Sequence, residues 1–404
     1  MDARTIGNTI AALRKKQKLT QGALAEMLDV SDKAISKWEN GQGYPDITMF
    51  PKLAAIFGVS ADYLMLGERR GIAIAGNMLV DVVKNIGSYP EIGKLTFIND
   101  ISRSVGGCVP NTAIDLTRID RTLPVKAIGK IGMDDNGRFV VSEMQKNGID
   151  VTAVCYDKDT ATGFTDVMSI PSGERTFFCK KGTNATFAPE DVDLDALNCD
   201  LLHIGYLLLL ERFDAYDEEY GTKMARFLSE VQTRGIETSI DVVTDPTADF
   251  SKKVVPVLKY ANYVIINEIE CCATFGMEPY TADGVLDCDT VRLCMQKMVE
   301  CGVSGKVIVH CKERGFCLDA KSGDFSEVMS LKIPKEDIKG SVGAGDAFCA
   351  ASLYGIYNNY TDKQILEFAS AAAACNLFAA NSVDGMLPKN EILKIATKYE
   401  RLKA

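Results

Sequence analysis

A glycine-rich segment near the end of the chain combines backbone groups that bind anions with one carboxylate. Residues 340–346 read GSVGAGD, and the small residues at 349–352 favour a helix that packs closely on a sheet. The first N–H groups of a helix lack intrahelical partners and lie at its positive end, so they bind phosphate. A carboxylate beside phosphate is useful if it takes a proton from an attacking hydroxyl. Asp346 is therefore a candidate general base, although G-A-G-D alone also fits a plain helix cap.

Two polar residues follow an apolar, strand-like run at residues 263–266. Asn267 and Glu270 stand in the sequence NEIE. Amide and carboxylate oxygens at a strand end can hold Mg²⁺ through water, as a nucleoside triphosphate requires. A helix cap or a surface carboxylate would explain the same residues without a metal.

Two further segments carry groups suited to the hydroxyls of a polyol. Gly107 belongs to a glycine pair that opens a helix, and Asn111 follows with an amide that can bind hydroxyls. Asp81 stands just past the apolar run at residues 72–75. Turns and caps are the structural alternatives for each, but four such motifs in this order rarely arise together by chance.

From about residue 71 onward, apolar strand-like runs alternate with amphipathic helical segments. The runs are 72–75, 125–128, 201–204, 238–242, 263–266 and 306–309, and the helical segments lie near 110–119, 137–147, 221–233 and 289–301. This alternation predicts an α/β domain with a mostly parallel sheet, whose ligands bind beyond the carboxyl ends of the strands. The Thr-rich region 161–178 alternates differently and is expected to form a small antiparallel flap.

The part of the chain up to Glu68 shows helical periodicity instead. Apolar spacing predicts helices near 6–13, 21–28, 32–40, 53–57 and 60–64, with Thr20 and Ser31 as caps of the second and third. Ile35 and Trp38 are expected to point inward only in part. Two short helices joined by a tight turn form a helix-turn-helix. Because the periodicity changes within a short link at residues 66–71, we expect domains at 1–68 and 71–404.

The composition restricts the class of protein. The chain has 404 residues, 47% of them hydrophobic, which excludes a mainly disordered chain. It lacks an uninterrupted apolar run of about 18 residues and begins without a signal-peptide pattern, so we expect a soluble cytoplasmic protein with no membrane contact. The segment up to Glu68 carries equal numbers of acidic and basic side chains, so the net charge of −10 does not exclude nucleic acid as its partner. The thirteen cysteines lack C-x-x-C spacing and are expected to be reduced, buried thiols.

Together the motifs of the larger part resemble the ribokinase/PfkB family of carbohydrate kinases over about residues 71–395. Further matching segments are GKIGMDDNG (129–137), GERTF (173–177) and GTNATFAPEDVD (182–193). A G-x-x-x-x-G-K-[ST] string is absent, which argues against a P-loop kinase. The resemblance implies a ribokinase-like, doubly wound α/β fold with a small β lid. It also implies ATP- and Mg²⁺-dependent phosphorylation of a hydroxyl on a small sugar or a nucleoside.

The resemblance also assigns roles to residues. Asp346 is the general base, and the N–H groups of Gly343, Ala344 and Gly345 form the anion hole. The other implied positions are Asp81, Gly107, Asn111, Asn184 and Lys180 for substrate, Asn267, Gly315, Gly343 and Gly345 for nucleotide, and Glu270 and Asn267 for Mg²⁺. GSV at 340–342 stands where the family often has Asp-Thr-Thr, so a usual ligand of the activating monovalent cation is missing and dependence on K⁺ stays open. His310 and its two successors replace a common Thr-Leu-Gly, which alters the ribose side of the nucleotide site.

Residues 19–46, LTQGALAEMLDVSDKAISKWENGQGYPD, resemble a helix-turn-helix of the Cro/phage-repressor type. The resemblance implies that the helix after Ser31 is the recognition helix and that five residues face operator DNA, namely Gln21, Lys33, Ser36, Lys37 and Asn40. Such domains read half-sites as dimers, so a homodimer is expected. Asp32 departs from the pattern and places a carboxylate near the passing phosphates. A helical module kept for protein contacts is the alternative.

Two functions remain open at this point. The intact Asp346 favours a working sugar kinase, and the fused helix-turn-helix suggests a transcriptional regulator that responds to the sugar. A non-catalytic sensor of sugar or nucleotide would carry the same two parts.

Overall fold

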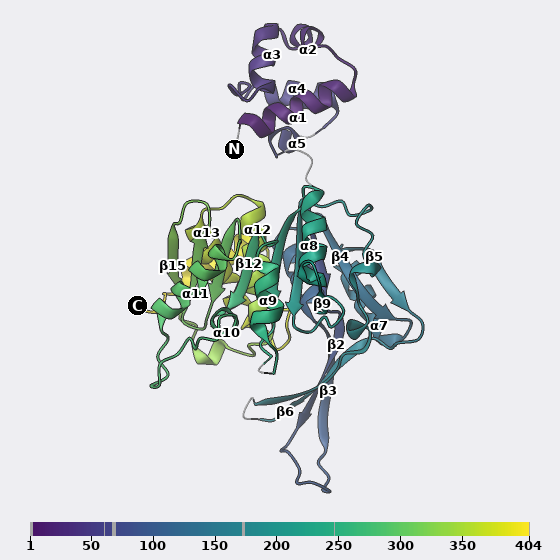
Figure 1. Cartoon of the computed structure of the whole chain (residues 1–404), viewed down its shortest axis with the longest axis vertical. Helices are drawn as coiled ribbons and strands as arrows, with labels where there is room; N and C mark the ends of the chain where they lie inside the picture. The colour runs from purple at the N-terminus through teal and green to yellow at the C-terminus, as the bar shows by residue number, and fades with distance from the viewer. Residues whose placement is uncertain (1–2, 60, 67–69, 172–173, 246, 404) are drawn as a thin grey trace. The chain divides into compact units, whose positions relative to one another are not determined.

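The computed structural model describes residues 3–59, 61–66, 70–171, 174–245 and 247–403. They form two compact units, Met1–Arg70 and Gly71–Ala404 (Figure 1). The expected link at residues 66–71 lies partly outside the described residues, and so does Ser60, the expected start of the fifth helix. Among the helices described, none is both long enough and apolar enough to cross a membrane.

The first unit is a bundle of five helices, as the periodicity predicted. They are α1 (Ala3–Lys16), α2 (Gln21–Leu28), α3 (Asp32–Glu39), α4 (Met49–Phe57) and α5 (Ala61–Leu66). Thr20 Oγ1 accepts the N–H of Ala23 at 3.0 Å and Ser31 Oγ that of Ala34 at 3.3 Å, so both act as the predicted caps.

The expectation that Ile35 and Trp38 point inward only in part was wrong. Both side chains are buried in the core of the bundle. The reason is the close approach of α1 to α3, since a Cβ on Gly7 would lie only 1.9 Å from the carbonyl oxygen of Trp38.

A nine-stranded sheet forms the centre of the second unit. Its strands, in spatial order, are β15 (Phe325–Met329), β14 (Arg314–Asp319), β13 (Lys306–His310), β12 (Tyr263–Asn267), β11 (Glu237–Val242), β8 (Leu201–Leu207), β1 (Ile72–Gly76), β4 (Val125–Gly132) and β5 (Asp150–Asp157). All neighbours from β5 to β13 pair in parallel, and β14 and β15 are antiparallel. The predicted mostly parallel sheet is confirmed. A separate two-stranded ribbon joins β9 (Tyr216–Asp217) and β10 (Gly221–Thr222).

Helices cover both faces of this sheet, because alternate side chains of the central strands enter two different cores. Ile72 and Ile74 of β1 belong to one core and Ala73 and Ala75 to the other. The first core receives α6 (Cys108–Ile119), α7 (Asp135–Lys146), α12 (Ala344–Tyr357), α13 (Asp362–Asn376) and α14 (Lys389–Lys398). The second receives α8 (Lys223–Thr233), α9 (Phe250–Leu258), α10 (Glu268–Ala273) and α11 (Cys288–Glu300). Short 3₁₀ helices occur at Gly182–Ala185, Pro189–Asp191 and Lys335–Asp337.

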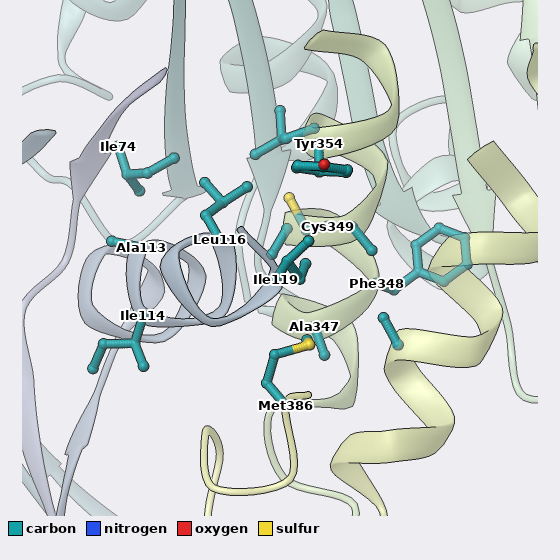
Figure 2. Packing of buried hydrophobic residues seen from close by; sticks show 14 of the residues in the cluster. Ile74, Ala113, Ile114, Leu116, Ile119, Ala347, Phe348, Cys349, Tyr354 and Met386 are labelled. Carbon is teal, nitrogen blue, oxygen red and sulfur yellow. The ribbon is translucent and has the colours of Figure 1, made fainter. Parts of the chain in front are cut away.

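Helices α6 and α12 lie side by side in the first core (Figure 2). Ala113 and Leu116 of α6 and Ala347 and Cys349 of α12 are almost completely buried there. Their small and aliphatic side chains let the two helices approach closely, and this brings the first turns of both helices to the same edge of the sheet.

A four-stranded sheet projects from the larger one (Figure 1). In spatial order it contains β3 (Ile98–Gly106), β2 (Leu79–Ile86), β6 (Gly163–Ser169) and β7 (Arg175–Lys180). The expected antiparallel flap at 161–178 is confirmed by the antiparallel pair β6–β7, but this pair supplies only half of the sheet, whose central pair β2–β6 is parallel. The reason is that β2 continues directly from the turn after β1 and offers an edge to β6, which arrives much later in the chain.

Candidate functional site

A cavity of about 260 Å³ opens where several strands of the large sheet end beside the start of α12. The polar side chains that line it are those of Tyr206, Asp241, Thr244, Asn267, Glu270, His310 and Asp346. They come from the ends of β8, β12 and β13, from β11 and the residues that follow it, and from the first turns of helices α10 and α12. This is the edge at which parallel α/β sheets bind their ligands.

Asp346 lies in the first turn of α12, with only 7% of its surface exposed. Gly343 caps this helix with φ +81°, and a Cβ there would lie 2.5 Å from the carbonyl oxygen of Ser382. Glycine is therefore needed at position 343 for the tight entry into α12. Burial raises the pKa of Asp346 to about 6, while hydrogen bonds from Asn111 and Tyr206 act in the opposite direction. At neutral pH this carboxylate is mostly ionised and able to accept a proton.

The side chain of Asn111 faces Asp346 from α6. Its Nδ2 donates to Asp346 Oδ2 at 2.9 Å, and its Oδ1 accepts from Ser382 Oγ at 2.9 Å. Gly107 caps α6 with φ +88°, and a Cβ there would lie 2.6 Å from the carbonyl oxygen of Asn77. Gly107 thus shapes the turn that brings Asn111 into the site.

Asp81 lies on β2 of the four-stranded sheet β3-β2-β6-β7, hereafter the lid sheet, and its carboxylate lies against Gly106. A Cβ on Gly106 would lie 2.3 Å from Asp81 Oδ2. Burial raises the pKa of Asp81 to about 6 and the negative charge of Asp346 contributes to this rise, whereas Thr165 and Arg175 oppose it. The structure therefore brings together Asp81, Asn111 and Asp346, three of the residues that the sequence analysis assigned to substrate binding and catalysis.

Asn267 and Glu270 meet at the junction of β12 and α10. Asn267 Oδ1 accepts the N–H of Glu270 at 2.8 Å, and Glu270 Oε2 accepts the N–H of Asn267 at 3.0 Å, so the pair forms the capping box of α10. Glu270 Oε1 accepts from Thr244 Oγ1 at 2.8 Å. Burial raises the pKa of Glu270 to about 7. Asn267 and Glu270 therefore cap α10, and both residues also line the cavity, where their side-chain oxygens are potential metal ligands.

Two polar residues that line the cavity, Tyr206 and Asp241, were missed in the sequence analysis. The Tyr206 hydroxyl donates to Asp346, and the backbone N–H of Tyr206 donates to Asp241 Oδ1 at 2.6 Å. Tyr206 has φ +63°, which is unusual for a residue with a side chain. Tyr206 follows the recognised run 201–204, and Asp241 lies within the recognised run 238–242, so a search for polar side chains near strand ends, as for Asn267, would have found both.

A second cavity of about 300 Å³ shares His310 and Gly345 with the first. Its walls are largely apolar, with Leu331, Ile333, Phe348, Ala373 and Leu377 beside Cys311, Lys312 and Ser341. Gly315, expected beside the nucleotide, is not among the residues that line this cavity, and a Cβ there would lie 3.3 Å from Phe348 Cζ.

Two other expected substrate contacts do not point into the cavities. Asn184 is buried, with Oδ1 accepting the N–H of Met78 at 2.9 Å and Nδ2 donating to the carbonyl of Met78 at 3.0 Å. Both of its polar groups therefore hold the chain between β1 and β2. Lys180 ends β7 of the lid and is exposed.

In the first unit, Lys33, Lys37 and Asn40 are exposed along α3 and at its end, as the expected DNA-facing surface requires, and Ser36 is half-exposed. The Asn40 amide donates to the carbonyl of Ser36 at 2.8 Å.

Gln21, at the start of α2, is half-buried. Its Nε2 donates to Glu39 Oε2 at 2.8 Å, and Glu39 also forms two hydrogen bonds with Arg14, at 2.6 and 2.8 Å. Gln21 is therefore oriented by a largely buried ion pair.

Comparisons with known proteins match the two units of the chain to two different families. A family model described as pfkB family carbohydrate kinase matches residues 71–390, and a helix-turn-helix model matches residues 10–64. Fructokinase-1 of Zea mays is 22% identical over 349 residues, covering 83% of this chain and 100% of that protein. Ribokinase of Schizosaccharomyces pombe is 23% identical over 326 residues, covering 78% and 95%.

Solved structures show the same fold. The ribokinase of Arabidopsis thaliana, complexed with ribose and ATP, has a TM-score of 0.66 at 19% identity and covers 82% of this chain and 100% of its own. The ribokinase of Thermotoga maritima has a TM-score of 0.66 at 18% identity, covering 81% and 99%. Since the carbohydrate-kinase model covers most of the sequence, this chain belongs to the pfkB family of carbohydrate kinases and carries a helix-turn-helix domain at its N-terminal end.

Proposed function

We propose that the protein transfers the γ-phosphoryl group of ATP to a hydroxyl of a small sugar, with Asp346 as the general base. The observation that carries this proposal is the position of Asp346 in the first turn of α12, where it accepts a hydrogen bond from Asn111 and borders the 260 Å³ cavity. A proton acceptor then lies beside a helix start, whose first N–H groups lack intrahelical partners.

The residues would act in the following way. Asp346 takes the proton of the sugar hydroxyl as its oxygen attacks the γ-phosphorus, and the bond to ADP breaks on the opposite side. The N–H groups at Gly343, Ala344 and Gly345 stabilise the negative charge on the transferring group. Asp81 and Asn111 orient the sugar through its other hydroxyls. The lid sheet that carries Asp81 excludes water when substrate is bound.

The second cavity is suited to the nucleotide, because its apolar walls would accept a base while Gly345 and His310 connect it to the first. Carboxylate and amide oxygens of Glu270 and Asn267 fit Mg²⁺ carried by ATP, since this ion prefers oxygen donors and keeps several waters. When bound, Mg²⁺ neutralises charge on the phosphates. A protein of the same fold from E. coli, described as a ribokinase II, has been solved with ATP and Mg²⁺, which supports this combination.

The sugar class is drawn from the relatives. They include fructokinases, ribokinases and 5-dehydro-2-deoxygluconokinases. A nucleoside is the alternative substrate, because a nucleoside kinase of Methanocaldococcus jannaschii has the same fold with a TM-score of 0.63. Thermal shifts with sugars and nucleosides, each with an unreactive ATP analogue, would separate the two classes, because a ligand stabilises the folded state by mass action.

The decisive experiment on catalysis is Asp346→Asn. We expect an unchanged circular dichroism spectrum and a loss of turnover of roughly 10³-fold or more. Asp324→Asn, which changes an exposed aspartate beside a turn, is the matched control. Full turnover in Asp346→Asn would exclude this residue as the base.

We further propose that the helix-turn-helix unit binds operator DNA as part of a homodimer and that the sugar or nucleotide changes this affinity. Two exposed lysines on α3 support the DNA contact. Coupling between the sites must be reciprocal, so DNA should change the affinity for the sugar by the same factor. Operator binding that is identical with and without ligand would refute the coupling. Operator binding that responds to ligand in a chain without turnover would instead favour the non-catalytic sensor.

A further inference from the structure

Three side chains that commonly bind metals converge behind the candidate catalytic site. The Cys108 thiol, a nitrogen of the His203 ring and a carboxylate oxygen of Asp241 all lie within 4.8 Å of one another. All three side chains are buried, with His203 and Cys108 at 0% exposure. They come from the first residue of α6 and from the neighbouring strands β8 and β11.

A second thiol lies beside His203, outside this group of three. Cys349 Sγ is 3.6 Å from His203 Nε2, and this residue stands one helical turn after Asp346 on α12. The set is therefore two thiols, one imidazole and one carboxylate. Sulfur and nitrogen donors with a carboxylate are typical ligands of zinc and are poor ligands for Mg²⁺ or Ca²⁺.

The orientation of His203 agrees with a ligand role. Its Nδ1 lies 3.0 Å from Ser239 Oγ, so Nε2 is the ring nitrogen that faces Asp241 and Cys349. Metal-bound imidazoles are held in this way, because a hydrogen bond to the second ring nitrogen fixes the ring. Asp241 is oriented as well, since its Oδ1 accepts the N–H of Tyr206 while Oδ2 lies 3.8 Å from His203 Nε2.

A glycine in β8 admits one of the thiols, and the neighbouring cavity gives an ion access. A Cβ on Gly205 would lie 2.0 Å from Cys108 Sγ, so the glycine in β8 is what admits the thiol. Asp241 and Cys349 also line the 260 Å³ cavity, which gives an ion a path from solvent.

We propose that Cys108, His203, Asp241 and Cys349 bind one Zn²⁺ as a closed structural site. Zinc bound there displaces the thiol protons and ties α6 and α12 to β8 and β11, directly behind Asn111 and Asp346. The ligands come from four separated segments, which is why the spacing of the cysteines gave no sign of the site. This inference does not depend on the proposed kinase activity.

The test uses the full chain, purified under reducing conditions, stripped with a chelator and titrated with Co²⁺. We expect one Co²⁺ per chain, with the strong visible absorption of tetrahedral cobalt and a thiolate-to-cobalt band in the near ultraviolet. Zn²⁺ should then displace Co²⁺ and raise the thermal midpoint. Absence of the thiolate band, or a metal content far below one per chain after loading, would overturn the proposal.

Variants separate ligation from a purely structural polar cluster. Cys108→Ser and His203→Asn should abolish the thiolate band or weaken metal binding strongly, whereas Cys317→Ser, which changes a buried thiol in β14, should bind as the wild type does. Ser239→Ala keeps every ligand and should weaken binding by about 10- to 100-fold. If the ligand variants fail to fold, Ser239→Ala still decides, because unchanged metal affinity in that variant would contradict the assigned orientation of His203.

Discussion

The Tyr206 hydroxyl lies 3.0 Å from Oδ1 and 3.1 Å from Oδ2 of Asp346, within hydrogen-bonding distance of both oxygens. Tyr206 reaches this position with φ +63°, where β8 turns toward the cavity. The base candidate therefore accepts hydrogen bonds from two donors, the half-buried Tyr206 and the buried Asn111. Because a hydrogen bond to the ionised form stabilises it, Tyr206 holds the carboxylate in its basic state.

Tyr206→Phe should therefore move the acid limb of the pH–rate profile. Removing the hydroxyl removes a hydrogen bond that lowers the pKa of Asp346, so this pKa, about 6 in the wild type, should rise. In kcat/KM against pH, the rise in activity should shift to higher pH. Tyr263→Phe, whose hydroxyl donates to Glu237 on the same sheet, is the control and should leave the profile unchanged. A profile that does not move in Tyr206→Phe would show that this hydroxyl has no influence on the base.

Gly343→Ala tests the entry into α12. The position combines φ +81° with a site for Cβ only 2.5 Å from a backbone oxygen, so the backbone must shift. We expect a loss of about 2 kcal/mol or more in unfolding free energy, together with a lower kcat, because the N–H groups of the anion hole move. Gly235→Ala has a similar φ of +72° but open space around its Cβ, and should cost only about 1 kcal/mol. Equal losses in the two variants would mean that strain in φ alone explains both.

The parts of the site that belong to a short local motif could be predicted from the sequence. Asp346 and Asn111 each follow glycines that open a helix, and a short string of residues is enough to identify such a start. The parallel sheet was predicted for a similar reason, because each strand is a compact apolar run. The five helices of the first unit follow from caps and spacing that are equally local.

The pairing of strands that lie far apart in the sequence, and the side-chain contacts that depend on it, could not be predicted. Tyr206 and Asp241 meet because β8 and β11 are neighbours, yet β8 also pairs with β1, although β2 to β7 all lie between them in the chain. An apolar run predicts a strand but does not indicate which other strand will pair with it. The lid was half missed because β2 and β6 pair across the whole of α6, β4, α7 and β5. Asn184 was expected to contact substrate, and the hydrogen bonds that it forms with the backbone of Met78 have no signature in the sequence.

The buried carboxylate of Glu270 should make stability depend on pH. Burial raises its pKa from 4.5 to about 7, so the folded state keeps the proton while the unfolded chain loses it. The contribution of Glu270 to the free energy of unfolding is therefore greatest below about pH 4.5. It decreases as the pH rises toward 7, by at most about 1.4 kcal/mol per pH unit. Glu270→Gln, which keeps an acceptor for the N–H of Asn267, should lose less stability than the wild type between about pH 5 and 8.

The measurement can follow the two units separately. Trp38 is the single tryptophan and lies in the helix-turn-helix unit, so its fluorescence reports that unit, while far-ultraviolet circular dichroism is dominated by the larger one. Glu270→Gln should change only the second transition. The same pH dependence in both proteins would argue that Glu270 is already ionised at low pH in the folded state.

Lys37 on α3 is expected to contact a DNA phosphate. If it does, Lys37→Ala should weaken binding about equally for all sequences and reduce the slope of log affinity against log salt by about 1, because one fewer counterion is released. Lys52 on α4 is also exposed but lies outside the recognition helix, so Lys52→Ala is the control. Fluorescence anisotropy with a labelled duplex at several salt concentrations gives both slopes. A salt slope unaffected by Lys37→Ala but reduced by Lys52→Ala would move the DNA-binding surface from α3 to α4.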